Sequence, residues 1–314
     1  MLKYYFSEDN NMIKSNTHQN GCWVSAVTPT DEELNTISQH YNLDKNVLQA
    51  ALDEDERSRI DVDTDYKMIL VNIPVVEEHQ DKELYRTIPL SIIIVDTAII
   101  TVCSEESPIL NAFENNCIKD FRTQMKSRFV LQILYQTDIL YMQYLHNIDK
   151  KSDEVENKLH KSTKNRELIE LLKLEKSLVY FTTALRSNES VFEKLLRSDL
   201  VKKYQEDEEI LEDVIVENKQ AIEMANIYSG ILSGMMDAFA SVISNNLNIV
   251  MKVLAIVTIV MAIPTMLFSA YGMNVNIEGM PFAQRPYGFF IIIGSSVVLS
   301  IIAAVAFNKL RWFK

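Results

Sequence analysis

The sequence predicts a membrane protein in which an α/β domain comes first, long α-helices follow, and two transmembrane helices lie near the C-terminal end. Three observations predict this order. Residues 253–277 and 286–308 carry no charged side chain, and runs of 25 and 23 residues are long enough to cross a bilayer as helices. Short β-branched runs gather in the first 120 residues. Between these regions, proline and glycine are absent over long stretches, which favours long helices.

The first 120 residues mix strand and helix patterns. Strands of a mixed sheet are predicted where β-branched residues run together, at 67–76, 88–95 and 98–102. Helices are predicted at 30–41 and 44–53. Thr30 and Glu33 have the spacing of a capping box at the start of the first helix. The charged segment 77–83 is predicted to be a solvated turn between two strands.

The middle of the chain is predicted to be helical. Apolar residues recur at helical spacing through 129–145, through 168–185 and from about 210 onward. If the last helix runs unbroken from 206 to 271, its 66 residues form a rod of roughly 100 Å. We therefore expect an α/β domain at 1–120 and long helices, including a stalk, at 121–249. A first span at 250–271, an external loop at 272–286, a second span at 287–308 and a basic tail at 309–314 are expected to follow.

Charge is unevenly distributed along the chain. The formal net charge is −12, and residues 251–314 carry +4, which leaves −16 for the first 250 residues. This acidic surface argues against nucleic acid as a partner and attracts cations, although a solvated surface without a function has the same composition.

The topology of the chain in the membrane follows from its ends. The first residues lack the apolar stretch and cleavage site of a secretory signal, so the first 250 residues are expected in the cytoplasm. Basic residues flank the two spans on that side, as the positive-inside rule requires, at Lys252, Lys309, Arg311 and Lys314. The chain is thus predicted to cross the lipid bilayer of the inner or plasma membrane twice, with both termini cytoplasmic.

Signatures of enzymes are missing from the sequence. Gly21 is the only glycine among the first 229 residues, which excludes glycine-rich phosphate loops there, and no HExxH or GxSxG motif occurs. The histidines show no zinc-ligand spacing: His18, His40, His79, His146 and His160. Cys22, Cys103 and Cys117 form no close pair, as expected in a reducing cytosol. We expect neither an enzyme nor an organic cofactor.

The first span carries a stripe of small or mildly polar residues. Its members recur at steps of three and four and therefore share one helical face: Asn248, Met251, Ala255, Thr258, Ala262, Thr265 and Ser269. A helix face exposed to lipid is expected to carry Leu and Ile instead. The stripe therefore either packs against another helix or lines water. Pro264 removes one backbone hydrogen bond and is expected to bend this span locally.

The stripe is followed by Tyr271-Gly272-Met273-Asn274 and a short loop that contains Met280-Pro281. A GMN tripeptide at the end of the first of two C-terminal spans resembles the signature of the CorA family of magnesium and cobalt channels. The segment from Asn248 to Leu254 also resembles the start of that family's pore helix. The resemblance is clearest from about residue 211 to the end, and the order of domains extends it over the whole chain.

This resemblance implies a funnel-shaped homopentamer in which the first span of each copy lines a pore and the second surrounds it. In family terms, Gly272, Met273 and Asn274 form the selectivity filter and Tyr271 supports it. The pore-lining positions are Asn248, Met251, Leu254, Thr258 and Thr265, of which Met251 and Leu254 form a hydrophobic gate. Our stripe contained Ala255 rather than Leu254, and we follow the family for the gate, since apolar rings close a pore by dewetting.

The filter residues suit magnesium chemically. Mg²⁺ dehydrates reluctantly, and a ring of neutral oxygens from Asn274 can hold its water shell without stripping it. Gly272 is expected to allow a tight turn at the helix end, while Met273 and Tyr271 are expected to pack. The loop departs from the family because its only acidic residue is Glu278, so cation attraction at the mouth is expected to be weaker.

In the family, divalent ions bound between cytoplasmic domains hold the channel closed. Asp213 matches the stalk-helix aspartate of that site. Its partner is expected in the segment 77–81, where the register indicates His79 with Glu78 beside it. A solvated turn remains the alternative interpretation of this segment.

We therefore predict a passive channel for hydrated Mg²⁺, with Co²⁺ or Ni²⁺ as further ions, gated by intracellular divalent cations. A membrane potential of 100 mV drives a +2 ion by about 4.6 kcal/mol, so no ATP site is needed. One alternative is a relative that moves zinc, coupled to protons. The other is a membrane-anchored metal sensor that does not conduct.

Overall fold

The computed structural model describes residues 2–8, 11–15, 18–79, 82–118, 121–161, 165–201, 204–282 and 284–309. The chain divides into two compact units, Met1–Met236 and Asp237–Lys314. Arg311 and Lys314 of the predicted basic tail lie outside the described residues.

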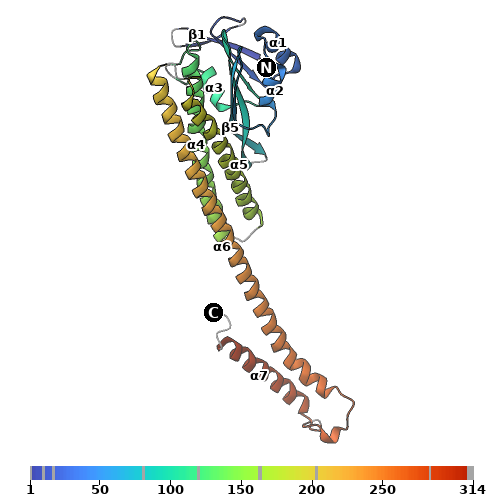
Figure 1. Ribbon diagram of the computed structural model, residues 1–314. Coiled ribbons are helices and arrows are strands. Elements are labelled where there is room, and N and C mark those ends of the chain that lie inside the picture. The colour runs from blue at the N-terminus through green and yellow to red at the C-terminus, as the bar shows by residue number, and fades with distance from the viewer. Residues whose placement is uncertain are drawn as a thin grey trace. The chain divides into compact units, whose positions relative to one another are not determined.

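A mixed β-sheet forms the centre of the first unit (Figure 1). Within the described residues it has seven strands in the order β2-β1-β3-β7-β6-β5-β4. Their bounds are Leu2–Glu8 (β1), Asn11–Ser15 (β2), Cys22–Val27 (β3), Arg59–Val62 (β4), Lys67–His79 (β5), Lys82–Ile94 (β6) and Ala98–Cys103 (β7). β3 and β7 pair in parallel and the other neighbours pair antiparallel. The predicted mixed sheet is confirmed.

The three predicted strands correspond to β5, β6 and β7, whereas β1, β2, β3 and β4 were not predicted. β1, β2 and β4 are partly polar segments whose strand conformation depends on pairing with a neighbour rather than on composition. Tyr5 of β1, for example, is buried because its ring stacks on Trp23 of β3 at 5.1 Å between centroids.

The prediction of a turn at 77–83 is wrong for most of that segment. β5 continues to His79 and β6 begins at Lys82, with Glu77 opposite Leu84 and His79 opposite Lys82. The ladder of an antiparallel hairpin joins backbone groups, so it can continue through a charged sequence. Residues 80 and 81 of the segment lie outside the described residues.

Short helices flank the sheet: α1 (Asp31–Tyr41), α2 (Lys45–Gln49), the 3₁₀ turn η1 (Ala50–Leu52) and α3 (Pro108–Glu114). The capping box predicted at α1 is present, because the Thr30 hydroxyl accepts from the Glu33 amide while the Glu33 carboxylate accepts from the Thr30 amide. The Asp44 carboxylate caps α2 in the same way by accepting from the amide of Asn46 at 3.0 Å. These caps satisfy amide groups that the first helical turn leaves without partners.

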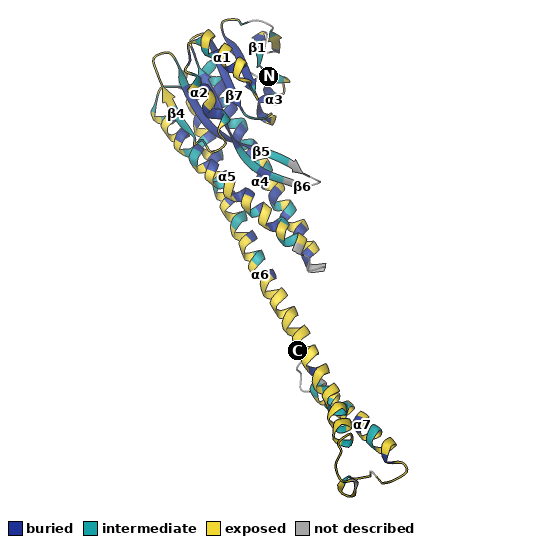
Figure 2. Ribbon diagram, turned by 90° about the vertical axis from the view of Figure 1, so that its right-hand side faces the viewer, coloured by how far each residue is buried: buried dark blue, intermediate teal, exposed yellow. Residues whose placement is uncertain are grey.

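Each face of the sheet packs against a different set of helices (Figure 2). Trp23, Ile69 and Ile99 point to one face, where they join Phe113 of α3 and Phe129 in one core cluster. The residues that follow or precede them on the strands, such as Val24 and Ile100, point to the other face and pack with Leu34 and Ile37 of α1. Side chains alternate between faces along a strand, so the same strands serve both cores.

Three long helices follow the sheet: α4 (Lys126–Lys161), α5 (Asn165–Arg197) and α6 (Gln205–Tyr271). The helix predicted to run unbroken from 206 to 271 is confirmed, because α6 contains 67 residues and continues through Pro264. After it come the 3₁₀ turn η2 (Ile277–Gly279) and α7 (Gly288–Lys309). α6 therefore begins in the first unit and ends in the second.

A buried amide pair joins α5 to the sheet. Asn188 accepts from the backbone amide of Asn72 at 2.9 Å and donates to the Asn72 carbonyl at 2.8 Å. The Ser58 hydroxyl also donates to Asn188, at 2.8 Å, and the Tyr141 hydroxyl of α4 donates to the Asn72 carbonyl at 2.9 Å. One fully buried side chain thus fixes the position of α5 against β5.

We predict that Asn188→Ala destabilises the protein by about 2–3 kcal/mol, because the buried amide of Asn72 loses its partner. Thermal melting of the detergent-solubilised full chain measures this as a lower Tm. The matched control is Asn157→Ala on α4, whose exposed amide donates within its own helix and whose loss is expected to cost less than about 0.5 kcal/mol. Equal losses of Tm in the two variants would contradict the role of Asn188.

Candidate functional site

The C-terminal unit consists of the last part of α6, the loop 272–287 and α7. Among the described residues, two helices are long and apolar enough to cross a membrane, Gln205–Tyr271 in its C-terminal part and Gly288–Phe307. Large apolar side chains on them are exposed, including Val257, Phe268 and Ile301. Such a surface needs lipid or further copies of the chain to cover it.

One face of α6 packs against α7. Ile256 is buried and Val260, Ile263 and Leu267 are partly buried, at steps of three and four that place them on one side of the helix. On α7 this contact uses a small residue, Ser296, which is 1% exposed. Small side chains let two helices in a membrane approach closely.

Pro264 has a defined partner in this contact. Proline lacks an amide hydrogen, so the carbonyl four residues earlier, that of Val260, loses its helical donor. The Ser300 hydroxyl of α7 donates to this carbonyl at 3.4 Å. In a bilayer no water is available to satisfy a freed carbonyl, and a neighbouring serine is a usual substitute. The chain thus passes through Pro264 as a continuous helix.

Of the predicted pore-lining residues, Met251, Leu254, Thr258 and Thr265 lie on the opposite face of α6, and Asn248 lies about 80° around the helix axis from Ile256. All five are exposed in the single chain: Asn248, Met251, Leu254, Thr258 and Thr265. Thr258 follows the buried Ile256 by two positions, which is about 200° around the helix axis. Ala255, which the stripe contained in place of Leu254, is exposed as well. One side of α6 therefore meets α7, and the other side is uncovered.

The two threonines present oxygen atoms on the uncovered face. Thr258 donates its hydroxyl hydrogen to the Leu254 carbonyl at 2.8 Å, and Thr265 donates to the Met261 carbonyl at 3.0 Å. Because each hydrogen is used within the helix, the lone pairs of the hydroxyl oxygen remain free to accept. An acceptor of this kind suits the hydrogens of water around a cation.

α6 ends at the tetrapeptide that carried the resemblance. The Gly272 amide donates to the carbonyls of Phe268 at 2.9 Å and Ser269 at 3.2 Å. A Cβ atom at this position would lie 3.3 Å from the Phe268 carbonyl oxygen, so the helix end leaves little space for a side chain. Gly272 does not adopt the left-handed conformation, and space rather than backbone torsion is what the position requires.

The loop that follows is tied back to the helix end. The Tyr271 hydroxyl donates to the Pro281 carbonyl at 2.6 Å, across the loop. Asn274 is exposed, and Met273, which we expected to pack, is 59% exposed in the single chain. Gly288 was not predicted to matter, but a Cβ atom there would lie only 2.1 Å from the carbonyl oxygen of Phe282.

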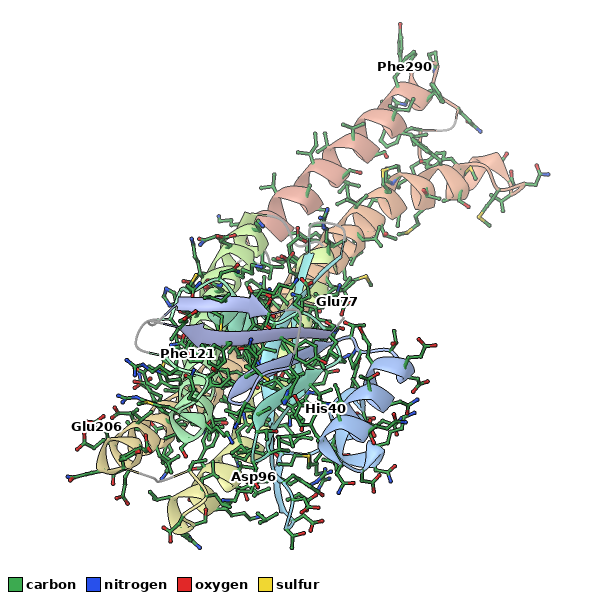
Figure 3. All side chains as sticks on the ribbon, turned by 90° about the horizontal axis from the view of Figure 1, so that it is seen from above. His40, Glu77, Asp96, Phe121, Glu206 and Phe290 are labelled. Carbon is green, nitrogen blue, oxygen red and sulfur yellow. The ribbon has the colours of Figure 1, made fainter. Side chains whose placement is uncertain are left out.

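The structure describes the side chain of only one of the three predicted regulatory residues. Asp213 is exposed on α6. Glu78 and His79 belong to β5, and their side chains lie outside the described part of the structure. Glu77, labelled in Figure 3, pairs instead with Arg86, at 3.5 Å between Oε2 and Nε. In the part of the chain that the structure describes, no group of three or more His, Cys, Asp or Glu residues could hold a metal ion.

Two histidines meet in the first unit although their spacing in sequence gave no signal. The rings of His18 and His40 lie 4.4 Å apart between centroids, and Nδ1 of His18 lies 2.6 Å from the Tyr41 hydroxyl. Burial, together with the neighbouring His40, lowers the pKa of His18. The contacts indicate a packed polar cluster beside Cys22, whose sulfur lies 3.5 Å from the same nitrogen.

We predict that Ser300→Ala lowers the Tm of the detergent-solubilised protein by the equivalent of about 1 kcal/mol, because the Val260 carbonyl loses its donor. Ser295→Ala is the matched control on α7, since the exposed Ser295 hydroxyl donates to Ile292 within its own helix. A change in the control as large as that in Ser300→Ala would refute the assigned contact.

A family model described as CorA-like Mg²⁺ transporter protein matches residues 18–309 of the chain. The cobalt/magnesium transport protein CorA of Methanocaldococcus jannaschii is 29% identical over 299 residues, covering 92% of this chain and 90% of that protein. The cobalt/magnesium transport protein CorA of Thermotoga maritima is 22% identical over 297 residues, covering 92% of this chain and 82% of that protein. These relatives bear the names of transport proteins.

The fold is also similar to a solved structure. The complete structure of the CorA magnesium transporter from Methanocaldococcus jannaschii matches with a TM-score of 0.82 at 26% identity, over 99% of this chain and 98% of that chain. The match includes the α/β domain, the long helix and both apolar helices.

Proposed function

Because the chain belongs to the family of CorA-like Mg²⁺ transporter proteins, we propose that it forms a membrane channel for hydrated Mg²⁺, with Co²⁺ and Ni²⁺ as further ions. The observation that carries this proposal is the division of α6 into two faces. One face packs against α7 through Ile256 and the Val260 carbonyl. The other exposes the predicted pore-lining residues that lie between Asn248 and Thr265 in the sequence.

The two faces support an assembly in which α6 lies inside and α7 outside. Copies of α6 around an axis would turn their uncovered faces inward, and α7 would meet lipid through exposed residues such as Val298 and Ile302. Resemblance to the family favours a homopentamer. Polar and small side chains at membrane depth are expected where they face water or a neighbouring helix rather than lipid.

Along this proposed pathway each residue type has a role. Asn274 at the outer mouth would offer neutral oxygens to the water shell of Mg²⁺, supported by Gly272, Met273 and Tyr271. Thr258 and Thr265 would accept hydrogen bonds from the same water shell farther along. Met251 and Leu254 would form apolar rings, and such rings close a pore by excluding water.

The direction of flow would follow the membrane potential. We propose that both termini are cytoplasmic, with Lys252 and Lys309 at the inner ends of the two spans. A potential of 100 mV, negative inside, then favours entry of a +2 ion by about 4.6 kcal/mol. Uptake is therefore passive.

Regulation would come from divalent ions at the cytoplasmic units. Asp213 is exposed on α6 and lies before the span on the same helix. No described group within one chain has the ligands for an ion. Resemblance to the family favours a site between cytoplasmic domains, in which an ion held by Asp213 would also use groups from a second copy. Such an ion would join neighbouring copies and hold the pore closed while internal Mg²⁺ is plentiful.

Two other functions fit the site less well. A zinc pathway would favour histidine or cysteine ligands, and the sequence contains neither after His160. A membrane-anchored sensor requires two spans, but it does not require Asn274 or a row of exposed polar residues on α6. The magnesium channel uses both features.

Rescue of a bacterium that lacks its own magnesium uptake tests the channel. Expression of the chain is expected to restore growth at low Mg²⁺, and Asn274→Ala is expected to reduce uptake by about tenfold or more, since each copy loses a hydrogen bond to the hydrated ion. Asn276→Ala is the matched control, because its side chain instead accepts from the Glu278 amide in the loop. No rescue despite expression in the membrane would overturn the uptake function, and equal rescue by Asn274→Ala would overturn the filter assignment.

Flux into proteoliposomes tests the regulatory role of Asp213. Asp213→Lys places a positive charge where a divalent ion would bind, so inhibition by Mg²⁺ on the cytoplasmic side is expected to need about tenfold more Mg²⁺ or more. Glu212→Lys is the control, because Glu212 is exposed on a different side of α6. Unchanged inhibition in Asp213→Lys would remove this residue from the regulatory site.

A further inference from the structure

Asp138 on α4 is a buried carboxyl group that the proposed function does not use. The residue is 0% exposed, and neither Oδ1 nor Oδ2 accepts a hydrogen bond from any described residue. A carboxylate that is buried without partners costs far more than one in water, and such a group commonly binds a proton instead.

The register of α4 and α6 shows what lies beside Asp138. Arg128 at the start of α4 contacts Glu206, labelled in Figure 3, at 3.0 Å, and Asp149 farther along α4 is hydrogen-bonded to Tyr228. Partners in these two contacts are 78 and 79 positions apart, so the two helices run parallel with a constant offset. That offset places Glu217 level with Asp138.

Glu217 is the neighbouring charge. Burial raises the pKa of Asp138 well above its usual value, and the negative charge of Glu217 raises it further. Glu217 itself is partly exposed to solvent. Two negative charges at this level of the helix packing would repel each other through a medium of low dielectric constant.

Within the part of the chain that the structure describes, α5 places no buried positive charge at this level. On α5, the buried residues at this level are Ala184, Leu185 and Asn188, and the adjacent Arg186 is exposed. On α4, Tyr141 is buried, donates to the sheet and has a raised pKa, caused by burial and then by the charge of Asp138.

Asn218 adds a second acceptor at the same level. Its side-chain nitrogen donates to the Leu185 carbonyl at 3.1 Å, whereas its fully buried Oδ1 has no partner among the described residues. Oxygens that all accept, with no donor among them, are best satisfied by one added proton.

We propose that Asp138 binds a proton in the folded protein at neutral pH, with the charge of Glu217 beside it, which makes this buried carboxyl group a proton-binding site between α4 and α6. The proton comes from solvent, one per chain, and leaves the pair of carboxyl groups with a single negative charge. A proton needs no cavity, so the site is compatible with close packing of the helices.

The site makes stability depend on pH in a defined direction. Because the pKa of Asp138 is higher in the folded chain than in the unfolded one, its favourable contribution is complete below an unfolded pKa of about 3.9 and is lost as pH rises toward the folded pKa. Over that interval the unfolding equilibrium constant rises by about tenfold per pH unit relative to a variant that cannot ionise at residue 138.

The experiment compares the full chain in detergent with Asp138→Asn. Infrared spectroscopy at neutral pH is expected to show a protonated carboxyl band in the wild type that Asp138→Asn lacks. The Tm of the variant minus that of the wild type is expected to grow between about pH 5 and about pH 8. Asp153→Asn, at an exposed position of α4, is the matched control and is expected to retain the band and the wild-type pH dependence.

Glu217→Gln keeps the proposal testable if Asp138→Asn fails to fold. It removes the neighbouring charge, so the pH at which the wild-type band disappears is expected to fall in this variant.

An unchanged band in both variants, or Tm values that vary with pH in parallel in wild type and Asp138→Asn, would overturn the proposal. If added Mg²⁺ rather than a proton abolishes the difference in Tm, the pair holds a divalent ion and the proton assignment is wrong. None of these measurements depends on channel activity.

Discussion

Satisfaction of backbone polar groups without water is the constraint on which the C-terminal unit depends. Inside a bilayer each amide and carbonyl needs a partner within the protein, and α6 meets this need as one continuous helix. The single helical donor that Pro264 removes is replaced by Ser300 of α7. This contact fixes which side of α6 meets α7, and therefore which side remains for Thr258 and Thr265 to face the proposed pathway.

The same constraint separates two kinds of buried polar group in the first unit. Asn188 is satisfied on every side by Asn72 and Ser58, so it holds α5 against the sheet. Asp138 is buried as deeply but has no hydrogen-bond partner among the described residues, so its effect on stability depends on its protonation state rather than on its contacts. A satisfied group contributes stability at every pH at which the protein folds, whereas an unsatisfied carboxyl makes stability depend on the proton.

Helices were more predictable than strands because their hydrogen bonds are local. The apolar residues at helical spacing from about 210 onward predicted α6, whose first residue lies within one position of the expected 206, and the capping box at Thr30 located α1. β1 and β4 escaped prediction because their strand conformation comes from partners elsewhere in the sequence. The segment 77–83 failed for the same reason, since pairing between β5 and β6 overrides its charged composition.

The sequence by itself determined the class of the protein: two uncharged runs, the tripeptide Gly272-Met273-Asn274 near the end of the first run and a long helix before them are all local patterns. Only the tertiary structure decided which atoms meet. The contact of Ser300 with Val260 and the level that Asp138 shares with Glu217 join residues on different helices. Periodicity specifies the face of a helix, but the partner of that face depends on how separate helices pack.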